Sequence, residues 1–211
     1  MKLVVFGATG GTGKQVVERA LAAGHEVVAV ARKPAAIATK HARLNVVAGD
    51  VLDRASLEAA IAGADAVVSA FGPANNKEPG TLMSEGVKNL VAACEATGVK
   101  RLVFESGLMV GDGSGLSLFG RTGVAVYRWL YRKLTADKRL AEASLTASKL
   151  DYAIVRPPTL VDAPARGTYV FGVDRRLDPT KALPHGDVAE LLVRAASEPE
   201  FARTVQQVGE P

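Results

Sequence analysis

The chain has 211 residues, of which 48% are hydrophobic and 23% are charged, and its net charge is +4. This length fits one α/β domain, the hydrophobic runs are too short for a membrane span, and the cations are dispersed rather than grouped with aromatic residues as in a nucleic-acid site. The N-terminal hydrophobic run is too brief for a signal peptide, and Cys94 is the only cysteine. We therefore expect a cytoplasmic protein without disulfides, membrane span or nucleic-acid partner.

Short hydrophobic segments alternate with amphipathic helical segments along the chain. The expected strands are residues 2–6, 26–30, 44–48, 66–70, 101–105 and 152–156, and the expected helices are residues 11–23, 54–61, 81–97, 123–148 and 186–197. Residues 32–43 have room for a short helix only. This alternation predicts an α/β fold, namely a Rossmann-type doubly wound parallel sheet with helices on both faces. We expect a single domain over residues 1–211, with the substrate pocket formed by C-terminal loops.

The first expected strand runs directly into a glycine-rich turn, GATGGTG, at residues 7–13. Glycine allows a tight bend and a close approach of the backbone to a pyrophosphate, and the start of the next helix offers unpaired N–H groups and a positive dipole. The threonines add hydroxyl groups. In this context between strand and helix the spacing predicts a dinucleotide site rather than a ligand-free turn. The predicted binding residues are Gly7, Thr9, Gly10, Gly11, Thr12 and Gly13.

The end of the second expected strand indicates which dinucleotide binds. An NAD-binding domain usually has an acidic residue there for the ribose 2′-hydroxyl. This chain has Arg32 and Lys33 instead. Arg32 can make a bidentate contact with a 2′-phosphate and stack on adenine, and Lys33 adds a point charge. We therefore predict NADP(H) as the cofactor, the alternative being that both are ordinary surface cations.

The ends of the next two strands complete the expected cofactor cleft, because ligands collect at the carboxyl ends of parallel strands. Asp50 and Val51 follow the third strand. The Asp50 carboxylate either accepts a hydrogen bond from the adenine amino group or caps the next helix. Ala70, Phe71 and Gly72 follow the fourth strand, where small residues let the backbone pass close to a ribose.

One glycine-rich stretch interrupts the alternation of strands and helices. Residues 107–123 contain six glycines and follow the fifth expected strand. A loop of this length in this position is usually functional. The hydrophobic and aromatic residues that follow it, among them Tyr127, form a helix packed on the sheet. The alternatives are the lining of a substrate pocket together with Met109, Leu116 and Phe119, or a subunit or membrane contact.

Motifs that extend over nearly the whole chain carry a resemblance to a known family. They are Gly7 to Gly13, Arg32, Gly49-Asp50-Val51, Met83 to Leu90, Ser106, Asp137-Lys138, Arg156-Pro157-Pro158 and Asp187-Val188-Ala189. In this order they resemble the atypical short-chain dehydrogenase/reductase superfamily. The similar branch is the small NAD(P)H-binding one, which contains flavin reductases that also reduce biliverdin, and NmrA-like proteins.

The resemblance implies an NADP(H)-dependent reductase with the nicotinamide near Ser106, Pro157 and Pro158. In the flavin and biliverdin reductases a serine at the end of the fifth strand faces the reacting ring, and Ser106 matches it. The residues alone leave a second interpretation of Ser106, a loop hydroxyl bonded to its own backbone. The biliverdin-reducing relatives have a histidine just after the two prolines, where this chain has Thr159, and that difference argues against biliverdin itself.

The catalytic tyrosine of the wider superfamily is missing. Its Tyr-x-x-x-Lys motif places a phenol and an ammonium on one helix face. Lys138 matches the lysine, but Leu134 occupies the tyrosine position, and Tyr131 lies about two turns away on a continuous helix. Carbonyl reduction by a tyrosine is therefore disfavoured. Reduction of a flavin, quinone or similar conjugated acceptor does not need it, because the proton can come from solvent.

We accordingly predict an enzyme that transfers hydride from NADPH to a small conjugated acceptor, with Ser106 and Lys138 as catalytic residues and a monomer or homodimer as the assembly. The alternative is an NmrA-like NADP(H) sensor without turnover, and a sugar-nucleotide isomerase or epimerase fits less well. The three histidines, His25, His41 and His185, are interpreted as surface residues without a metal site. The resemblance leaves an alternative for His185, because the family has a helix start near the substrate side at this position. Asp187 is interpreted as a helix N-cap.

Overall fold

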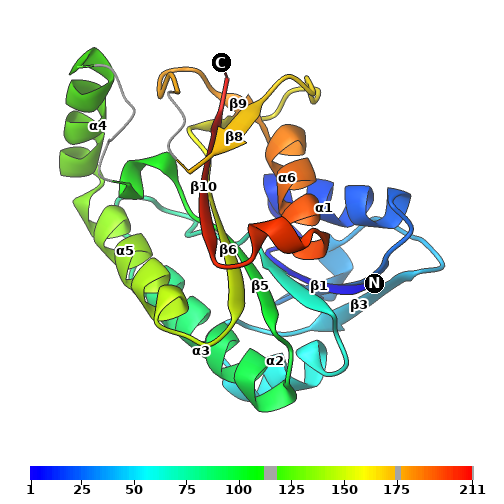
Figure 1. The fold of residues 1–211 in the computed structure, drawn as a ribbon. Coiled ribbons are helices and arrows are strands. Elements are labelled where there is room, and N and C mark those ends of the chain that lie inside the picture. The colour runs from blue at the N-terminus through cyan, green and yellow to red at the C-terminus, as the bar shows by residue number, and fades with distance from the viewer. Residues whose placement is uncertain (112–117, 174–176, 211) are drawn as a thin grey trace.

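The computed structural model describes residues 1–111, 118–173 and 177–210, and Figure 1 shows a central sheet with helices packed against both of its faces. Eight strands follow one another across the sheet in the order β3-β2-β1-β4-β5-β6-β10-β8. They are β1 (Lys2–Phe6), β2 (Glu26–Ala31), β3 (Leu44–Ala48), β4 (Ala66–Ser69), β5 (Arg101–Glu105), β6 (Asp151–Arg156), β8 (Val170–Gly172) and β10 (Thr204–Gly209).

All neighbouring strands of this sheet are parallel except β8, which pairs antiparallel with β10. The predicted Rossmann-type sheet is therefore confirmed, and all six expected strands are present. The sequence patterns missed β8 and β10, as well as a small parallel pair formed by β7 (Leu160–Val161) and β9 (Leu183–Pro184).

Six α-helices and three short 3-10 helices connect the strands. They are α1 (Gly11–Ala22), α2 (Arg54–Ile61), α3 (Leu82–Thr97), α4 (Leu118–Leu130), α5 (Arg132–Thr146), α6 (His185–Ser197), η1 (Pro34–Ala36), η2 (Leu108–Val110) and η3 (Pro199–Phe201). The short helix expected between residues 32 and 43 is η1. None of the described helices is long and hydrophobic enough to cross a membrane.

Each face of the sheet contributes to its own hydrophobic core, because alternate side chains of a strand point to opposite faces. Leu3 and Val5 of β1 pack in the core that includes α1 and α6, whereas Val4 and Phe6 pack in the core with α2, α3 and α5. Figure 1 shows these two helical layers on opposite sides of the sheet. Cys94 of α3 is fully buried in the second core, and burial raises the pKa of its thiol to about 12. This cysteine is thus a packed core residue.

The single helix expected over residues 123–148 is wrong. Helix α4 starts earlier, at Leu118, and ends at Leu130, and α5 starts after the non-helical Tyr131 (φ −114°, ψ 36°). Helix α5 packs on α3, whereas α4 turns away from the sheet in Figure 1 and leaves Trp129 69% exposed. The Arg128 guanidinium donates to the carbonyls of Met109 and Gly111. The break separates α5, which packs on α3, from α4, which contacts α5 and η2. Residues 112–117, just before α4, lie outside the described part.

We predict that Gly7→Ala destabilises the protein far more than Gly24→Ala. Both glycines have left-handed backbones, φ 80° and 88°, so both alanines cost about 1 kcal/mol in conformation. A Cβ at Gly7 would lie 2.5 Å from the carbonyl carbon of Ala70, whereas a Cβ at Gly24 would meet nothing within 4 Å. We expect Gly7→Ala to lower the free energy of unfolding by about 3 kcal/mol or more, as measured by urea denaturation. Equal losses for the two variants would contradict the close approach.

Candidate functional site

Nine of the predicted cofactor residues line one cavity of about 180 Å³ at the carboxyl ends of β1 to β4. Its wall also includes Ala31, Gly49, Leu52 and Leu82. The glycine-rich turn forms one side, and the segments after β2, β3 and β4 form the others. The nine predicted residues are Gly7, Thr9, Gly10, Arg32, Asp50, Val51, Ala70, Phe71 and Gly72.

The other predicted residues of the glycine-rich turn, Gly11, Thr12 and Gly13, form the first turn of α1 and do not line this cavity. No side chain caps the start of α1, and its first turn contains no acidic residue, so its N–H groups and dipole can meet an anion. A Cβ at Gly13 would lie 2.1 Å from the carbonyl oxygen of Gly7. Only glycine therefore lets the helix start this close to the end of β1.

The two predicted cations at the end of β2 differ in position. Arg32 lines the cavity, and it has no carboxylate partner among the described residues. Lys33 is exposed, precedes η1 and lies outside the cavity wall. The structure therefore places Arg32, and not Lys33, beside the rest of the predicted cofactor residues.

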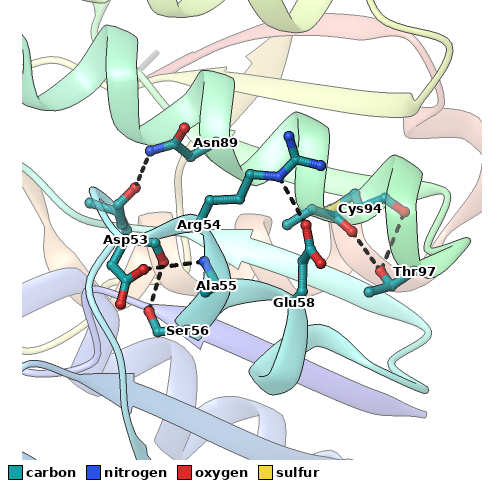
Figure 2. A network of polar contacts seen from close by, with 10 residues as sticks. Asp53, Arg54, Ala55, Ser56, Glu58, Asn89, Cys94 and Thr97 are labelled. Carbon is teal, nitrogen blue, oxygen red and sulfur yellow. Dashed lines mark hydrogen bonds and ion pairs between the residues drawn. The ribbon is translucent and has the colours of Figure 1, made fainter.

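The end of β3 corrects one of the two interpretations of Asp50. Helix α2 is capped by Asp53, whose carboxylate accepts the Ala55 N–H at 3.2 Å, as Figure 2 shows. The Asp50 carboxylate instead accepts the Leu52 N–H at 3.0 Å. The capping interpretation of Asp50 is therefore wrong, because the chain makes one more turn before the helix begins. Asn89 of α3 holds that turn by donating to the carbonyl of Val51 at 3.0 Å.

A second cavity, of about 280 Å³, lies at the carboxyl ends of β5 and β6. It contains all four remaining predicted residues, Ser106, Lys138, Pro157 and Pro158. The rest of its wall comes from the loop after β4, from η2, from α4 and α5, and from the segment after β6. These further residues are Asn76, Glu105, Gly107, Leu108, Met109, Val110, Tyr127, Leu134, Thr135, Thr159 and Leu160.

The Ser106 hydroxyl is buried and has no hydrogen-bond partner in the described structure. The interpretation that it bonds to its own backbone is therefore wrong. Its backbone is fixed instead, since the Ser106 N–H donates to the carbonyl of Val155 at 2.8 Å. Burying a hydroxyl without a partner is costly, so the oxygen is available for a ligand in the cavity that it lines.

Lys138 holds the backbone at the end of β5. Its Nζ donates to the carbonyl of Ser106 at 2.6 Å. Burial lowers the pKa of Lys138, and the nearby carboxylates of Glu105 and Glu142 raise it in part. Glu142 is itself paired with Arg156 of β6, through Nε and Oε1 at 3.0 Å. The lysine is thus a half-buried group in the cavity wall, surrounded by a network of opposite charges.

Leu134 lies in the wall of the second cavity, where the tyrosine of the superfamily motif would reach Lys138. We expected Tyr131 two turns before Lys138 on one continuous helix. This expectation is wrong, because the helix is broken at Tyr131, the residue before α5. The phenol in the cavity wall is that of Tyr127 on α4. Burial and the adjacent Tyr131 raise its pKa, so Tyr127 stays protonated at neutral pH. Met109 also lines the cavity, while the side chains of residues 116 and 119 lie outside the described part.

Glu105 is a site residue that the sequence reasoning missed. It ends β5, lines the second cavity and accepts a hydrogen bond from the Thr12 hydroxyl at 3.1 Å. Burial raises the pKa of its carboxyl to about 7, against the opposing effects of Lys138 and of the Thr12 hydrogen bond. A signal was available, since an acid at the end of a buried central strand, directly before Ser106, is unusual.

His185 is not the surface residue that we expected. Its Nδ1 lies 2.9 Å from the Thr12 hydroxyl, and its ring covers Gly11, where a Cβ would lie 2.6 Å from Nε2. Its side chain is 23% exposed, and Nε2 lies 3.7 Å from the exposed carboxylate of Asp162. The packing of α6 against α1 brings His185 to this position.

Asp187 is not the N-cap of α6. It lies inside the first turn of the helix, is fully buried and accepts the N–H groups of Arg166 and Gly167 at 2.9 to 3.1 Å. The carboxylate therefore fixes the loop after β7 rather than the end of the helix.

The residues at the carboxyl ends of the strands fit a dinucleotide on two counts. The glycine-rich turn leaves no space for a Cβ at Gly7 or Gly13, and the buried Ser106 hydroxyl lacks a partner in the described structure. A family model described as NAD(P)H-binding matches residues 7–199. The chain belongs to this NAD(P)H-binding family.

Individual relatives extend over almost the whole chain. An uncharacterised chloroplastic protein of Arabidopsis thaliana is 32% identical over 98% of this chain and 76% of its own length. The structure of ChuY from Escherichia coli O157:H7, an anaerobilin reductase, is 30% identical with a TM-score of 0.78 and covers 100% of this chain and 98% of its own. The oxidoreductase YlbE from Lactococcus lactis shares the fold, with a TM-score of 0.83 at 21% identity over 100% and 91% of the two chains.

We predict that the half-buried carboxyl of Glu105 makes the stability of this family member depend on pH. Its pKa is about 7 in the folded protein and about 4.5 when the chain is unfolded. Between these values the folded protein binds the extra proton, so the free energy of unfolding falls as pH rises, by at most about 1.4 kcal/mol per pH unit for this group. In Glu105→Gln this contribution to the pH dependence of the free energy of unfolding should disappear. Urea denaturation from pH 5 to 7, about the interval between the two pKa values, measures it. An unchanged slope would contradict the raised pKa.

Proposed function

We propose that the protein is an NADPH-dependent reductase of a conjugated acceptor, such as a flavin or a quinone. The observation that carries this proposal is the second cavity, where the unpartnered Ser106 hydroxyl and the half-buried Lys138 meet in one wall. The second cavity lies at the carboxyl ends of β5 and β6, which follow β4 in the sheet. A dinucleotide that extended from the first cavity along this edge of the sheet would place its nicotinamide in the second cavity.

The bound cofactor supplies a hydride, and the residues of the chain position and shield the reacting groups. The Ser106 hydroxyl would hydrogen-bond to the carboxamide or to the acceptor. Lys138 keeps Ser106 in place through its backbone carbonyl. Pro157 and Pro158 line the same cavity and have no N–H groups, so this part of its wall offers no hydrogen-bond donor from the backbone.

The proposed acceptor class follows from the groups in the cavity wall. Leu134 provides no phenol next to Lys138, so carbonyl reduction by the superfamily mechanism is not supported. Leu108, Met109, Val110 and Leu134 give the wall a hydrophobic part that suits a flat conjugated ring. The likeness to an anaerobilin reductase supports a reductase rather than a sensor.

We predict that the purified protein oxidises NADPH when FMN, a quinone or biliverdin is offered in turn, and that Ser106→Ala lowers kcat/KM about 10-fold or more. The rate of NADPH absorbance loss measures the reaction. Glu95→Gln, a change at an exposed position of α3, is the control and should match the wild type. Tight NADPH binding without turnover on any acceptor would favour the NmrA-like sensor instead.

We predict that Arg32 determines the preference for NADPH. Arg32→Ala should weaken NADPH binding about 10- to 100-fold and change NADH binding little, because the lost contact is a charge-assisted one to the 2′-phosphate. Lys33→Ala is the matched control and should have a much smaller effect, since Lys33 lies outside the cavity. Dissociation constants from fluorescence titration measure both. Equal losses for NADPH and NADH in Arg32→Ala would reject the proposed 2′-phosphate contact.

A further inference from the structure

Three groups from three different elements form a hydrogen-bonded chain that ends in the second cavity. The Thr12 hydroxyl of α1 lies 3.1 Å from Oε1 of Glu105 and 2.9 Å from Nδ1 of His185. Glu105 lines the cavity, while His185 is partly exposed at the other end of the chain. The arrangement therefore links a carboxyl inside the cavity to solvent through one hydroxyl and one imidazole.

We infer that Glu105 is the acid that protonates the reduced acceptor, and that His185 returns a proton to it through the Thr12 hydroxyl. This inference rests on the proposed reductase function. A conjugated acceptor that gains a hydride carries one additional negative charge and needs a proton to become the neutral product. Among the described residues that line the cavity, Glu105 is the only carboxylic acid.

The proton transfers balance in two steps. The two electrons arrive with the hydride from the reduced nicotinamide dinucleotide. The O–H bond of Glu105 then breaks, its proton forms a new bond on the acceptor, and Glu105 becomes a carboxylate. Afterwards the His185 imidazolium gives its Nδ1 proton to the Thr12 oxygen while the Thr12 proton passes to Glu105. The neutral imidazole keeps its Nε2 proton, turns its ring to expose Nδ1 and takes a proton there from a hydronium ion of the solvent.

A hydroxyl suits the middle position, because it can donate in either direction. When Glu105 is protonated, its O–H donates to Thr12, and the Thr12 hydroxyl donates to Nδ1 of His185. After Glu105 has given its proton to the acceptor, the Thr12 hydroxyl donates to Glu105 and a protonated Nδ1 donates to Thr12. Histidine is the side chain that exchanges protons with water most readily at neutral pH. Nε2 of His185 lies 3.7 Å from the exposed carboxylate of Asp162, at the outer end of the hydrogen-bonded chain.

Two other groups in the cavity are poorer proton donors. Burial raises the pKa of the Tyr127 phenol above its already high value, so this phenol gives up a proton less readily than Glu105 does. Lys138 already donates to the Ser106 carbonyl. The carboxyl of Glu105, with a pKa of about 7, matches the neutral range best.

The charged groups that face Glu105 come from the helices on both sides of β5. Lys138 of α5 lowers the pKa of its carboxyl, and Glu142 of the same helix is neutralised by Arg156 of β6. On the opposite face, α1 contributes the uncharged Thr12 and α6 contributes His185. The pH at which Glu105 loses its proton is therefore set by burial, which raises the pKa, against the charge of Lys138 and the Thr12 hydrogen bond, which lower it.

The first test compares acceptor reduction by wild type, Glu105→Gln and the control Glu95→Gln in a stopped-flow instrument. The acceptor is the member of the FMN, quinone and biliverdin panel that the wild type reduces. Because Glu105 is protonated below its pKa, the wild-type rate constant should be highest in acid and fall above pH 7, about where the carboxyl ionises. Glu105→Gln should be slower by about 100-fold and lose this pH dependence, whereas Glu95→Gln should match the wild type.

The second test separates the acid from its supply of protons. Thr12→Val interrupts the chain but leaves Glu105 protonated at the start, so one turnover with bound NADPH remains possible in this variant. Later turnovers should be slower by about 10-fold or more, and Thr12→Ser should restore them. The infrared carbonyl band of the protonated carboxyl, recorded on the protein without cofactor, should disappear as pH rises through 7 and be absent in Glu105→Gln.

The failures of the two proposals can be told apart. A wild type that reduces no acceptor ends the reductase proposal, and the proton relay with it, before any variant is measured. A wild type that is active while Glu105→Gln retains its rate and pH profile overturns the relay alone. Equal first and later turnovers in Thr12→Val, or no protonated carboxyl below pH 7 in the infrared spectrum, would also overturn it.

Discussion

The arrangement of the whole site depends on the close approach of two backbones, at Gly7 after β1 and at Ala70 after β4. These strands lie side by side at the centre of the sheet, with β2 and β3 on one side and β5 and β6 on the other. The order of strands reverses at this point, which opens a crevice between the connections that leave in opposite directions. Because Gly7 has no Cβ, the turn fits against Ala70, and α1 starts directly above the strand ends. The cavity lined by Gly7 and Ala70 lies at the carboxyl ends of β1 to β4, and the second cavity lies at the carboxyl ends of β5 and β6.

The periodicity of the sequence predicted six of the eight strands of the main sheet. The residues that follow these strands were predicted to form the site. Parallel strands place their carboxyl ends at one edge, so the residues that follow each strand meet in space although they are far apart in sequence. Predicted residues such as Arg32 and Ala70 therefore line one cavity, and Ser106 and Pro157 line the next. The positions that failed are those where packing between distant elements decides the outcome.

The break between α4 and α5 is one such position. The hydrophobic pattern around Trp129 and Leu130 continues that of α5, but these two side chains are exposed, whereas Leu134 is buried. Local sequence does not determine which part of a helical pattern packs on the sheet. Strand β10 was missed for a related reason, because Gln206 and Gln207 are buried despite their polar side chains.

The contacts of Thr12 were equally hidden from sequence patterns, since Glu105 and His185 lie 93 and 173 residues away along the chain. No spacing rule connects groups at such distances. In the structure one of these contacts is made by Glu105, at the carboxyl end of a central strand, where burial raises the pKa of the carboxyl to about 7. Burying an ionisable group costs free energy of folding. Groups with a shifted pKa are frequent at functional sites, because catalysis needs pKa values matched to its proton transfers.

The position of Lys138 explains how a site without the usual tyrosine can still control a proton. In the Tyr-x-x-x-Lys arrangement the lysine makes a phenol more acidic; here Leu134 occupies that place, and the same ammonium acts on the carboxyl of Glu105. Burial alone would raise the pKa of the carboxyl further, whereas the charge of Lys138 alone would lower it. The two effects partly cancel and leave the pKa at about 7. A carboxyl of this strength can give its proton to a reduced conjugated ring and recover it at neutral pH, a task for which a phenol with a raised pKa is too weak an acid.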